Sequence, residues 1–60
     1  MNNLQNLKFH RIQRHLTQES LAELSGISIR TIQRMEKGLS NGSPHSINAL
    51  AQALQVDSME

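Results

Sequence analysis

Residues 17–37 read TQESLAELSGISIRTIQRMEK, and this stretch decides the fold of the chain. It predicts two short helices, at 18–25 and 29–37, joined by a tight turn at Gly26. Glycine suits the turn because the residue after a helix often needs a positive φ, where a Cβ would clash. The spacing brings six apolar side chains to where the helices would pack on each other: Leu21, Ala22, Leu24, Ile27, Ile32 and Met35.

The helix predicted at 29–37 has a cationic, amide-rich face. At about 100° per residue, Ile32 and Met35 point to one side of it. The outward side carries four polar residues: Arg30, Gln33, Arg34 and Lys37. A compact helical pair that displays such a face is what a protein needs to place a helix in the DNA major groove.

Helix signals outside this stretch indicate a single all-α domain over residues 1–60. Residues 3–14 form a first helix candidate, and a later one has Ser43 as N-cap and Pro44 at its first position. The clearest apolar period of the chain follows: Ile47, Leu50, Ala51 and Leu54. Residues 57–60 look like the first turn of a further helix, which gives four or five helices.

Composition excludes several functional classes. The chain has 60 residues and no Cys, so no disulfide, thiolate metal site or Cys nucleophile is expected. No apolar run approaches the ~20 residues of a membrane span and no signal peptide is visible, so we expect a soluble, cytoplasmic protein. Phe9 is the only aromatic residue, which argues against the stacking platforms that bind single strands or RNA. A further domain after Glu60 stays open as an interpretation.

The net charge of +1 conceals an uneven distribution. Residues 1–40 hold all six Lys and Arg against three Glu, which leaves +3, while residues 41–60 hold one Asp and one Glu, which gives −2. The pI of about 8.4 is too mild to indicate nucleic-acid binding by itself. The position of the charges is therefore more informative than their sum.

Together, these segments resemble the phage-repressor and Cro type of helix-turn-helix, also called XRE-like, from about residue 7 to residue 56. The matching motifs are Leu16-Thr17-Gln18-Glu19, Leu21-Ala22, Gly26-Ile27-Ser28, Thr31-Ile32, Glu36-Lys37-Gly38, Leu50-Ala51-Gln52-Ala53-Leu54 and Val56. The resemblance implies a compact all-α, four- to five-helix, lambda-repressor-like DNA-binding domain whose helix-turn-helix is its second and third helices. His10 and His15 depart from the pattern, which often has an apolar residue and Gly there.

By position, the resemblance implies DNA-contacting roles in both helices of the motif. The residues that match groove-facing positions are Ser28, Ile29, Arg30, Gln33 and Arg34. Gln18 matches a place at the DNA backbone from which it braces a base-contacting side chain. Arg11 and Glu36 match a buried or half-buried ion pair that ties the first helix to the end of the third.

Further contacts are expected at phosphates, which fix the register of a protein on DNA without reading sequence. The N-terminus of the helix at 18–25 offers free amides and a positive dipole to a phosphate. The expected backbone contacts are Thr17, Gln18, Thr31, Lys37 and Arg14. Thr17 and Ser28 are also the N-caps of the two helices.

Each of these interpretations has a structural alternative. Arg30 and Arg34, one turn apart, could each fork onto O6 and N7 of a guanine, or they form a solvated charged face. The alternatives for Gln33 are that it reads adenine, that it contacts a phosphate, or that it is an exposed side chain with no role in binding. Ile29 touches thymine methyl groups or closes the edge of the core.

The three histidines, His10, His15 and His45, do not predict a metal or catalytic site. His10 and His15 lie about 140° apart round a helix, so they cannot share a ligand face. No carboxylate–histidine spacing suggests zinc, and a domain this small leaves no room for a pocket. We therefore expect no enzyme, no catalytic residue, no metal or other cofactor, and no small-molecule ligand.

The sequence favours a sequence-specific regulator of transcription, a repressor that binds double-stranded DNA. It would bind a palindromic operator as a homodimer. We expect it in the cytoplasm, at the nucleoid of a prokaryote or in a phage system, with no membrane partner. The alternative is an antitoxin or another protein–protein interaction module on the same fold, which docks a protein through Ile29 and Leu39. Steep weakening of binding with salt would favour DNA.

Overall fold

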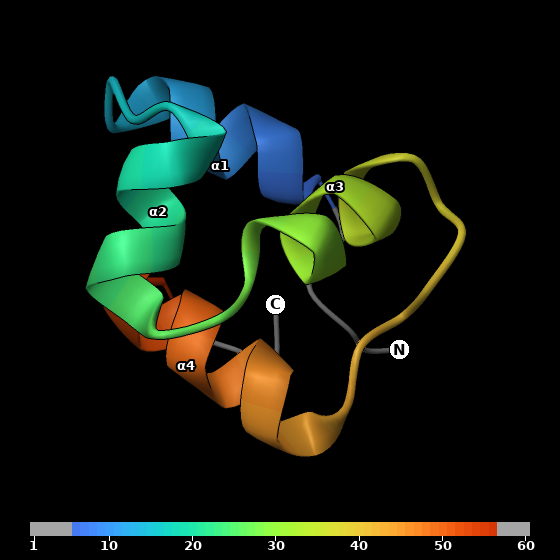
Figure 1. The fold of residues 1–60 in the computed structure, drawn as a ribbon. Helices are drawn as coiled ribbons and strands as arrows, with labels where there is room; N and C mark the ends of the chain where they lie inside the picture. Colours follow the sequence, from blue (N-terminus) through green and yellow to red (C-terminus); the bar gives the residue numbers. More distant parts are fainter. Residues whose placement is uncertain (1–5, 57–60) are drawn as a thin grey trace.

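Four helices make up residues 6–56, the part of the chain that the computed structural model describes (Figure 1). They are α1 (Leu7–Gln13), α2 (Gln18–Ser25), α3 (Ile29–Glu36) and α4 (Pro44–Leu54), and no strand occurs among these residues. The prediction of an all-α fold with two short helices around a tight turn is confirmed. The further helical turn expected at 57–60 lies outside the described residues.

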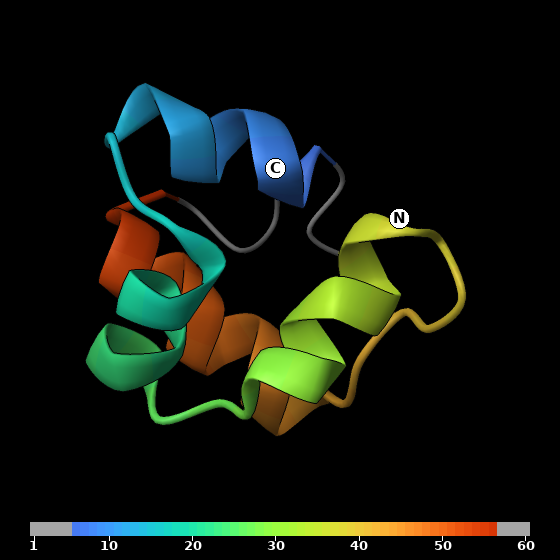
Figure 2. The ribbon, with the colours of Figure 1, turned by 45° about the horizontal axis from the view of Figure 1, so that its top comes forward.

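The helices enclose one small core. α2 packs on both α3 and α4, and α1 lies against α3. In Figure 1, α1 crosses the top, α2 and α3 stand on opposite sides, and α4 closes the bottom; Figure 2 shows the same arrangement with the top turned forward. Four side chains have no exposed surface at all: Leu21, Ile32, Leu50 and Leu54. Leu7 of α1 and Ile27 of the turn complete this core.

Side-chain caps define where three of the helices begin. The hydroxyl of Thr17 accepts a hydrogen bond from the backbone N–H of Ser20 at 3.0 Å. Ser28 and Ser43 cap α3 and α4 in the same way, and Pro44 occupies the first turn of α4. Each cap satisfies a backbone donor that the helix leaves free, which explains why these boundaries follow the sequence closely. The predicted N-caps are confirmed.

Leu24 does not pack between α2 and α3, and its assignment to the core was wrong. Its side chain is 63% exposed. The buried stripe of α2 is centred between Leu21 and Ala22, where Gln18 and Ser25 also fall. At about 100° per residue, Leu24 lies roughly 110° from that centre, so it faces the flank of the helix.

Two helices are shorter than predicted. α1 begins at Leu7 and ends at Gln13, whereas the sequence predicted 3–14, of which residues 3–5 lie outside the described part. Asn6, directly before α1, has φ 61°, a left-handed conformation in which a helix cannot continue. α3 ends at Glu36, and Lys37 is its C-cap rather than its last residue.

His15 ends the first helix in a conformation that usually belongs to glycine. Its φ is 58°. Its N–H donates to the carbonyl of Ile12 at 2.9 Å, and the N–H of Leu16 donates to the carbonyl of Arg11 at 3.1 Å. This pair of bonds is a Schellman motif, whose left-handed residue is most often Gly. The motif explains why the resembling family favours Gly at this place.

Candidate nucleic-acid interface

The turn between α2 and α3 sets the position of α3 on the body of the domain. Gly26 has φ 77°, and its N–H donates to the carbonyl of Ala22 at 2.9 Å, which closes the end of α2. Ile27 then enters the core with 7% of its surface exposed. Because a glycine bend is followed at once by a buried anchor, α3 leaves the turn in a fixed direction.

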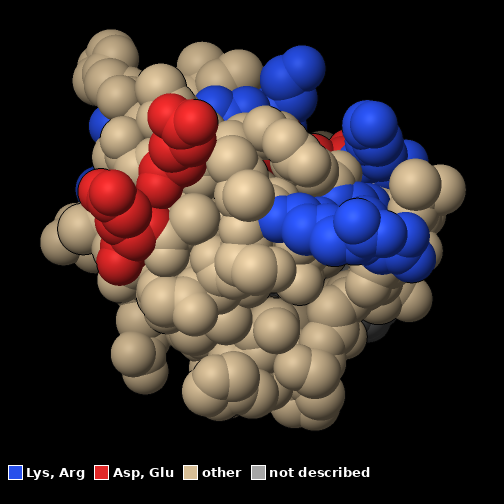
Figure 3. Space-filling model, viewed as in Figure 1, with Lys and Arg blue, Asp and Glu red and all other residues tan. Residues whose placement is uncertain are grey.

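α3 has one buried and one open face. Ile32 is buried in the core, Met35 is half-buried beside it, and Ile29 lies half-buried at the edge. On the opposite side, four polar side chains are exposed: Arg30, Gln33, Arg34 and Lys37. Blue basic side chains gather over α3 in Figure 3, whereas red acidic side chains lie over α2. The predicted cationic face is therefore a continuous surface of the folded chain.

The three cations of this face make no hydrogen bond and no ion pair with another described residue. Arg30, Arg34 and Lys37 are all exposed, and the ion pair found among residues 6–56 involves a different arginine. Arg30 and Arg34 are four residues apart, so they stand about 6 Å apart along the helix and about 40° apart around it. Two unpaired guanidinium groups in that arrangement can contact neighbouring anionic or acceptor groups on one ligand.

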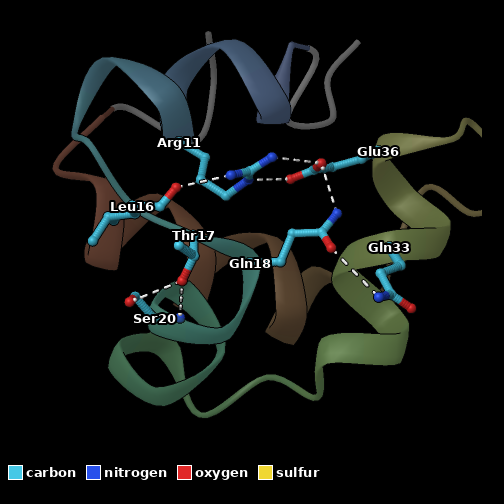
Figure 4. Close-up of polar contacts among 7 residues, drawn as sticks. All are labelled: Arg11, Leu16, Thr17, Gln18, Ser20, Gln33 and Glu36. Carbon is cyan, nitrogen blue, oxygen red and sulfur yellow. Dashed lines mark hydrogen bonds and ion pairs between the residues drawn. The ribbon is translucent and has the colours of Figure 1, made fainter.

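A polar network fixes the far end of α3 to α1 and α2 (Figure 4). Arg11 of α1 donates from Nε to Oε2 of Glu36 at 2.7 Å and from Nη2 to Oε1 at 3.2 Å. Its Nη1 donates to the carbonyl of Leu16 at 2.8 Å. Gln18, the first residue of α2, donates from Nε2 to Oε1 of Glu36 at 3.0 Å and accepts from Nε2 of Gln33 at 3.4 Å.

Burial and hydrogen bonding act in opposite directions on Glu36. Burial alone would raise the pKa of its carboxyl, but the hydrogen bonds from Arg11 and Gln18 outweigh it and hold the pKa below its ordinary value. The hydrogen bond to Glu36 in turn raises the pKa of Arg11. Both groups are therefore charged at neutral pH. Arg11 and Glu36 are a nearly buried ion pair, with side chains 11% and 6% exposed.

The structure brings most of the predicted contact residues to one side of the molecule, but not all of them. Thr17 and Gln18 lie at the N-terminus of α2, and Gln18 reaches across to Gln33 on α3. Arg14 is the C-cap of α1 and lies at the end of that helix that is farther from α3 (Figures 1 and 2). Its guanidinium donates to the side-chain and backbone oxygens of Gln55 at 3.1 and 3.4 Å. Arg14 is thus not part of the surface that α3 presents.

One cation that the sequence reasoning left out lies near this network. Lys8 of α1 is exposed, and its charge contributes to lowering the pKa of Glu36. The signal was present in the sequence, because Lys8 precedes Arg11 by three residues and the two therefore share one side of a helix. Lys8 adds positive charge close to the C-terminal end of α3.

Other kinds of site have little support in residues 6–56. No group of three or more His, Cys, Asp or Glu in this segment could hold a metal ion. None of the described helices is long and apolar enough to cross a membrane. An open depression of the surface lies between α1 and the end of α4. Phe9, His10 and Val56 line it, away from α3, and Arg14 is the one predicted contact residue at its wall.

Comparison with known proteins agrees with this geometry. A family model described as helix-turn-helix matches residues 7–60, a segment that contains all four helices and the whole open face of α3. No curated protein and no solved structure gave a significant match. The match covers far more than half of the chain and supports DNA binding in the regulation of transcription. The chain therefore belongs to the helix-turn-helix family of the XRE, Cro and C1 type.

Proposed function

We propose that the protein is a sequence-specific repressor that places α3 in the major groove of an operator and acts as a homodimer. The observation that carries this proposal is the open face of α3. Its arginines have no partner among the described residues, although the fold holds the helix rigidly by Ile32 on one side and Glu36 at its end. Charged side chains presented in this way on the second helix of a helix-turn-helix are suited to base edges and phosphates.

Arg30 and Arg34 are the proposed readers of guanine. Each can donate two parallel hydrogen bonds to O6 and N7, a contact worth about 1–3 kcal/mol of discrimination per base pair. Ser28 and Ile29 lie at the N-terminal end of α3, the end that enters the groove most deeply in this motif. Ile29 is half-buried, so part of its side chain remains open to a thymine methyl group.

Phosphate contacts would fix the register of the domain. Thr17 and Gln18 stand at the N-terminus of α2, where free backbone amides and the helix dipole favour an anion. Thr31 lies beside the open face of α3, and Lys37 lies on that face at its C-terminal end. These contacts carry no sequence information, but they determine where the arginines meet the bases.

Specificity argues for two copies of the domain. One recognition helix reads only about 3–4 base pairs, which is too few to single out one site in a genome. A homodimer on a palindromic operator, with half-sites one helical turn apart, doubles the number of bases read. An occupied operator excludes other proteins from the same groove, which supports repression. The proposed place of this activity is the cytoplasm, at the nucleoid.

The second candidate is a protein-docking module such as an antitoxin, and exposed apolar side chains favour it. Leu39, just after α3, is 63% exposed, and Phe9 and Ile12 stand exposed on α1. Apolar side chains of this size are typical anchors in protein interfaces when they cluster.

Selection of sites from random double-stranded DNA, followed by binding measurements at several salt concentrations, separates the two functions. DNA binding by α3 predicts an enriched palindromic site and a logarithmic salt slope of about −2 to −4 per protomer. Arg30→Ala and Arg34→Ala should each relax the base preference at one position per half-site, whereas Lys37→Ala should weaken binding to all sequences alike. Absence of an enriched site, or binding that barely responds to salt, would contradict the proposal.

A further inference from the structure

Three helices meet at the nearly buried carboxylate of Glu36. Arg11 of α1 and Gln18 of α2 hold it by hydrogen bonds of 2.7 to 3.2 Å (Figure 4). Lys37 follows Glu36 directly in the chain, as the C-cap of α3. Because the charges of Arg11 and Glu36 cancel, this corner of the domain takes its sign from the exposed cations around the pair.

Lys8 is one of these cations. It lies on α1 three residues before Arg11, so the two residues share one side of the helix. The charge of Lys8 is close enough to Glu36 to help lower the pKa of that carboxyl, which places the ammonium group at the same corner. Figure 3 shows basic side chains over α1 as well as over α3. The positive surface of α3 therefore continues onto α1.

No residue in the described part of the chain neutralises Lys8. It is exposed, and it makes no hydrogen bond and no ion pair with another residue of the segment 6–56. Glu36 is already occupied, because both of its oxygens accept hydrogen bonds and its side chain is only 6% exposed. A flexible, exposed ammonium group without such a partner is able to meet an anion of another molecule.

The N-terminus of α2 lies at the same corner as Lys8. Gln18 is the first residue of α2, and its side chain donates to Glu36 at 3.0 Å. The free amides and the dipole of that helix end favour a phosphate. A DNA strand that passes the N-terminus of α2 would therefore also pass close to the ammonium group of Lys8.

We infer that Lys8 contacts a phosphate of the DNA backbone and makes α1 a third element of the interface, beside α2 and α3. This inference rests on the proposed function of α3 as the DNA-reading helix. The contact has the same strength on every sequence, since a phosphate carries no base information. It raises affinity by releasing counterions from the DNA, and this release is measurable as a dependence of binding on salt.

The logarithmic salt slope measures the contact on duplex DNA of any sequence. Loss of one phosphate contact should reduce the slope by about 0.9 per protomer, so Lys8→Gln should bind about 5- to 10-fold more weakly at about 0.1 M salt. Lys8→Arg keeps the charge and should keep the slope. The control is Gln52→Glu on an exposed position of α4, which changes the net charge by the same amount. Urea unfolding with an unchanged midpoint would show that each variant is folded.

Neutral methylphosphonate, placed at one phosphate of the selected operator at a time, locates the contact. At one phosphate per half-site the parent should lose about 5- to 10-fold in affinity. Lys8→Gln should lose nothing further there, because both changes remove the same contact. The inference is overturned if Lys8→Gln keeps the slope of the parent, if Gln52→Glu reduces the slope as much, or if every phosphate affects the parent and Lys8→Gln equally.

The contact of Lys8 and the proposed function fail in different ways. If no sequence is enriched from random DNA but Lys8→Gln still reduces the slope on an arbitrary duplex, the sequence-specific function fails and the contact of Lys8 stands. If a site is enriched and Lys8→Gln keeps the slope of the parent, only the contact of Lys8 fails. A protein that binds no duplex DNA even at low salt would refute both.

Discussion

Replacing Glu36 by glutamine leaves Arg11 with a charge that no carboxylate balances. The two side chains are only 11% and 6% exposed, so water can replace the lost partner only in part. Removing one member of a buried ion pair typically costs about 3–5 kcal/mol. Glutamine keeps nearly the shape of glutamate, and the change therefore tests the charge rather than the packing.

The structure places the expected cost at the lower end of that range. Glutamine retains one oxygen that can accept from Arg11, but its amino group would face a donor where Oε2 now lies 2.7 Å from Nε. The bond from Arg11 to the carbonyl of Leu16 remains, and a small part of the guanidinium reaches solvent. We expect a loss of about 3 kcal/mol. A 60-residue domain has only about 3–9 kcal/mol in total.

Urea unfolding followed by circular dichroism measures this loss. Arg11→Met should cost a similar amount, because it strands the carboxylate. The double variant Arg11→Met/Glu36→Leu should cost less than either single change, because it leaves no unpaired charge. Glu23→Gln, at an exposed position of α2, is the control and should change the free energy of unfolding by no more than about 0.5 kcal/mol. A Glu36→Gln protein within 1 kcal/mol of the parent, at an unchanged urea slope, would refute the reasoning.

Acid provides a second test of the same pair. The folded chain lowers the pKa of Glu36 below its ordinary value of 4.5, so the unfolded state takes up the proton first as the pH falls. The stability that Glu36 contributes is therefore complete above that ordinary value and is lost as the pH falls through the folded pKa. The difference in unfolding free energy between the parent and Glu36→Gln should shrink over this window. A difference that is constant from pH 7 to pH 3 would contradict the assigned cause.

Four changes outside the ion pair test the backbone and the surface by thermal or urea unfolding. His15→Gly should raise the free energy of unfolding by about 0.5–1 kcal/mol. The φ of 58° strains histidine in the folded state, and the release of this strain outweighs the extra freedom that glycine gives the unfolded chain. A lower free energy of unfolding would show that the strain is absent. Gly42→Ala and Gly26→Ala should each lower it by about 1–2 kcal/mol, because both glycines have a positive φ, +76° and +77°, and the flexible end of Met35 can move away from a Cβ at Gly42; an unchanged stability would show that this strain is absent. Leu24→Gln should change it by no more than about 0.5 kcal/mol, and a larger loss would mean that Leu24 is buried in solution.

The helix starts could be predicted because capping is local chemistry. Thr17, Ser28 and Ser43 each bind a backbone N–H only three residues ahead, so the sequence contains both partners of the contact. Packing depends on more distant partners, and Leu24 shows the consequence. Its spacing from Leu21 fits a helix stripe, but which flank of that stripe is covered depends on where α3 and α4 lie.

The helix ends were harder to predict, because they depend on backbone conformations that the sequence indicates poorly. Glycine at 26 is a clear sign, because a positive φ costs it little. Asn6, His15 and Gln55 also adopt positive φ, although none of them is glycine. Such residues enter the left-handed region only where other contacts compensate for the strain, as the Schellman bonds at His15 and the bonds of Arg14 to Gln55 illustrate. The first helix was therefore predicted too long.

The open face of α3 could be predicted from the periodicity of the sequence, but the polar network behind that face could not. An 8-residue helix with Ile32 inside must present Arg30, Gln33 and Arg34 on the other side, whatever its neighbours are. The amide of Gln18 is different, because its orientation is set by a carboxylate 18 positions later in the chain. Periodicity can place both residues on facing helices, yet only the donor and acceptor chemistry of Glu36 decides which end of the amide faces Gln33. A second helix-turn-helix with the same open face but an apolar residue in place of Glu36 would therefore present Gln33 without a fixed orientation.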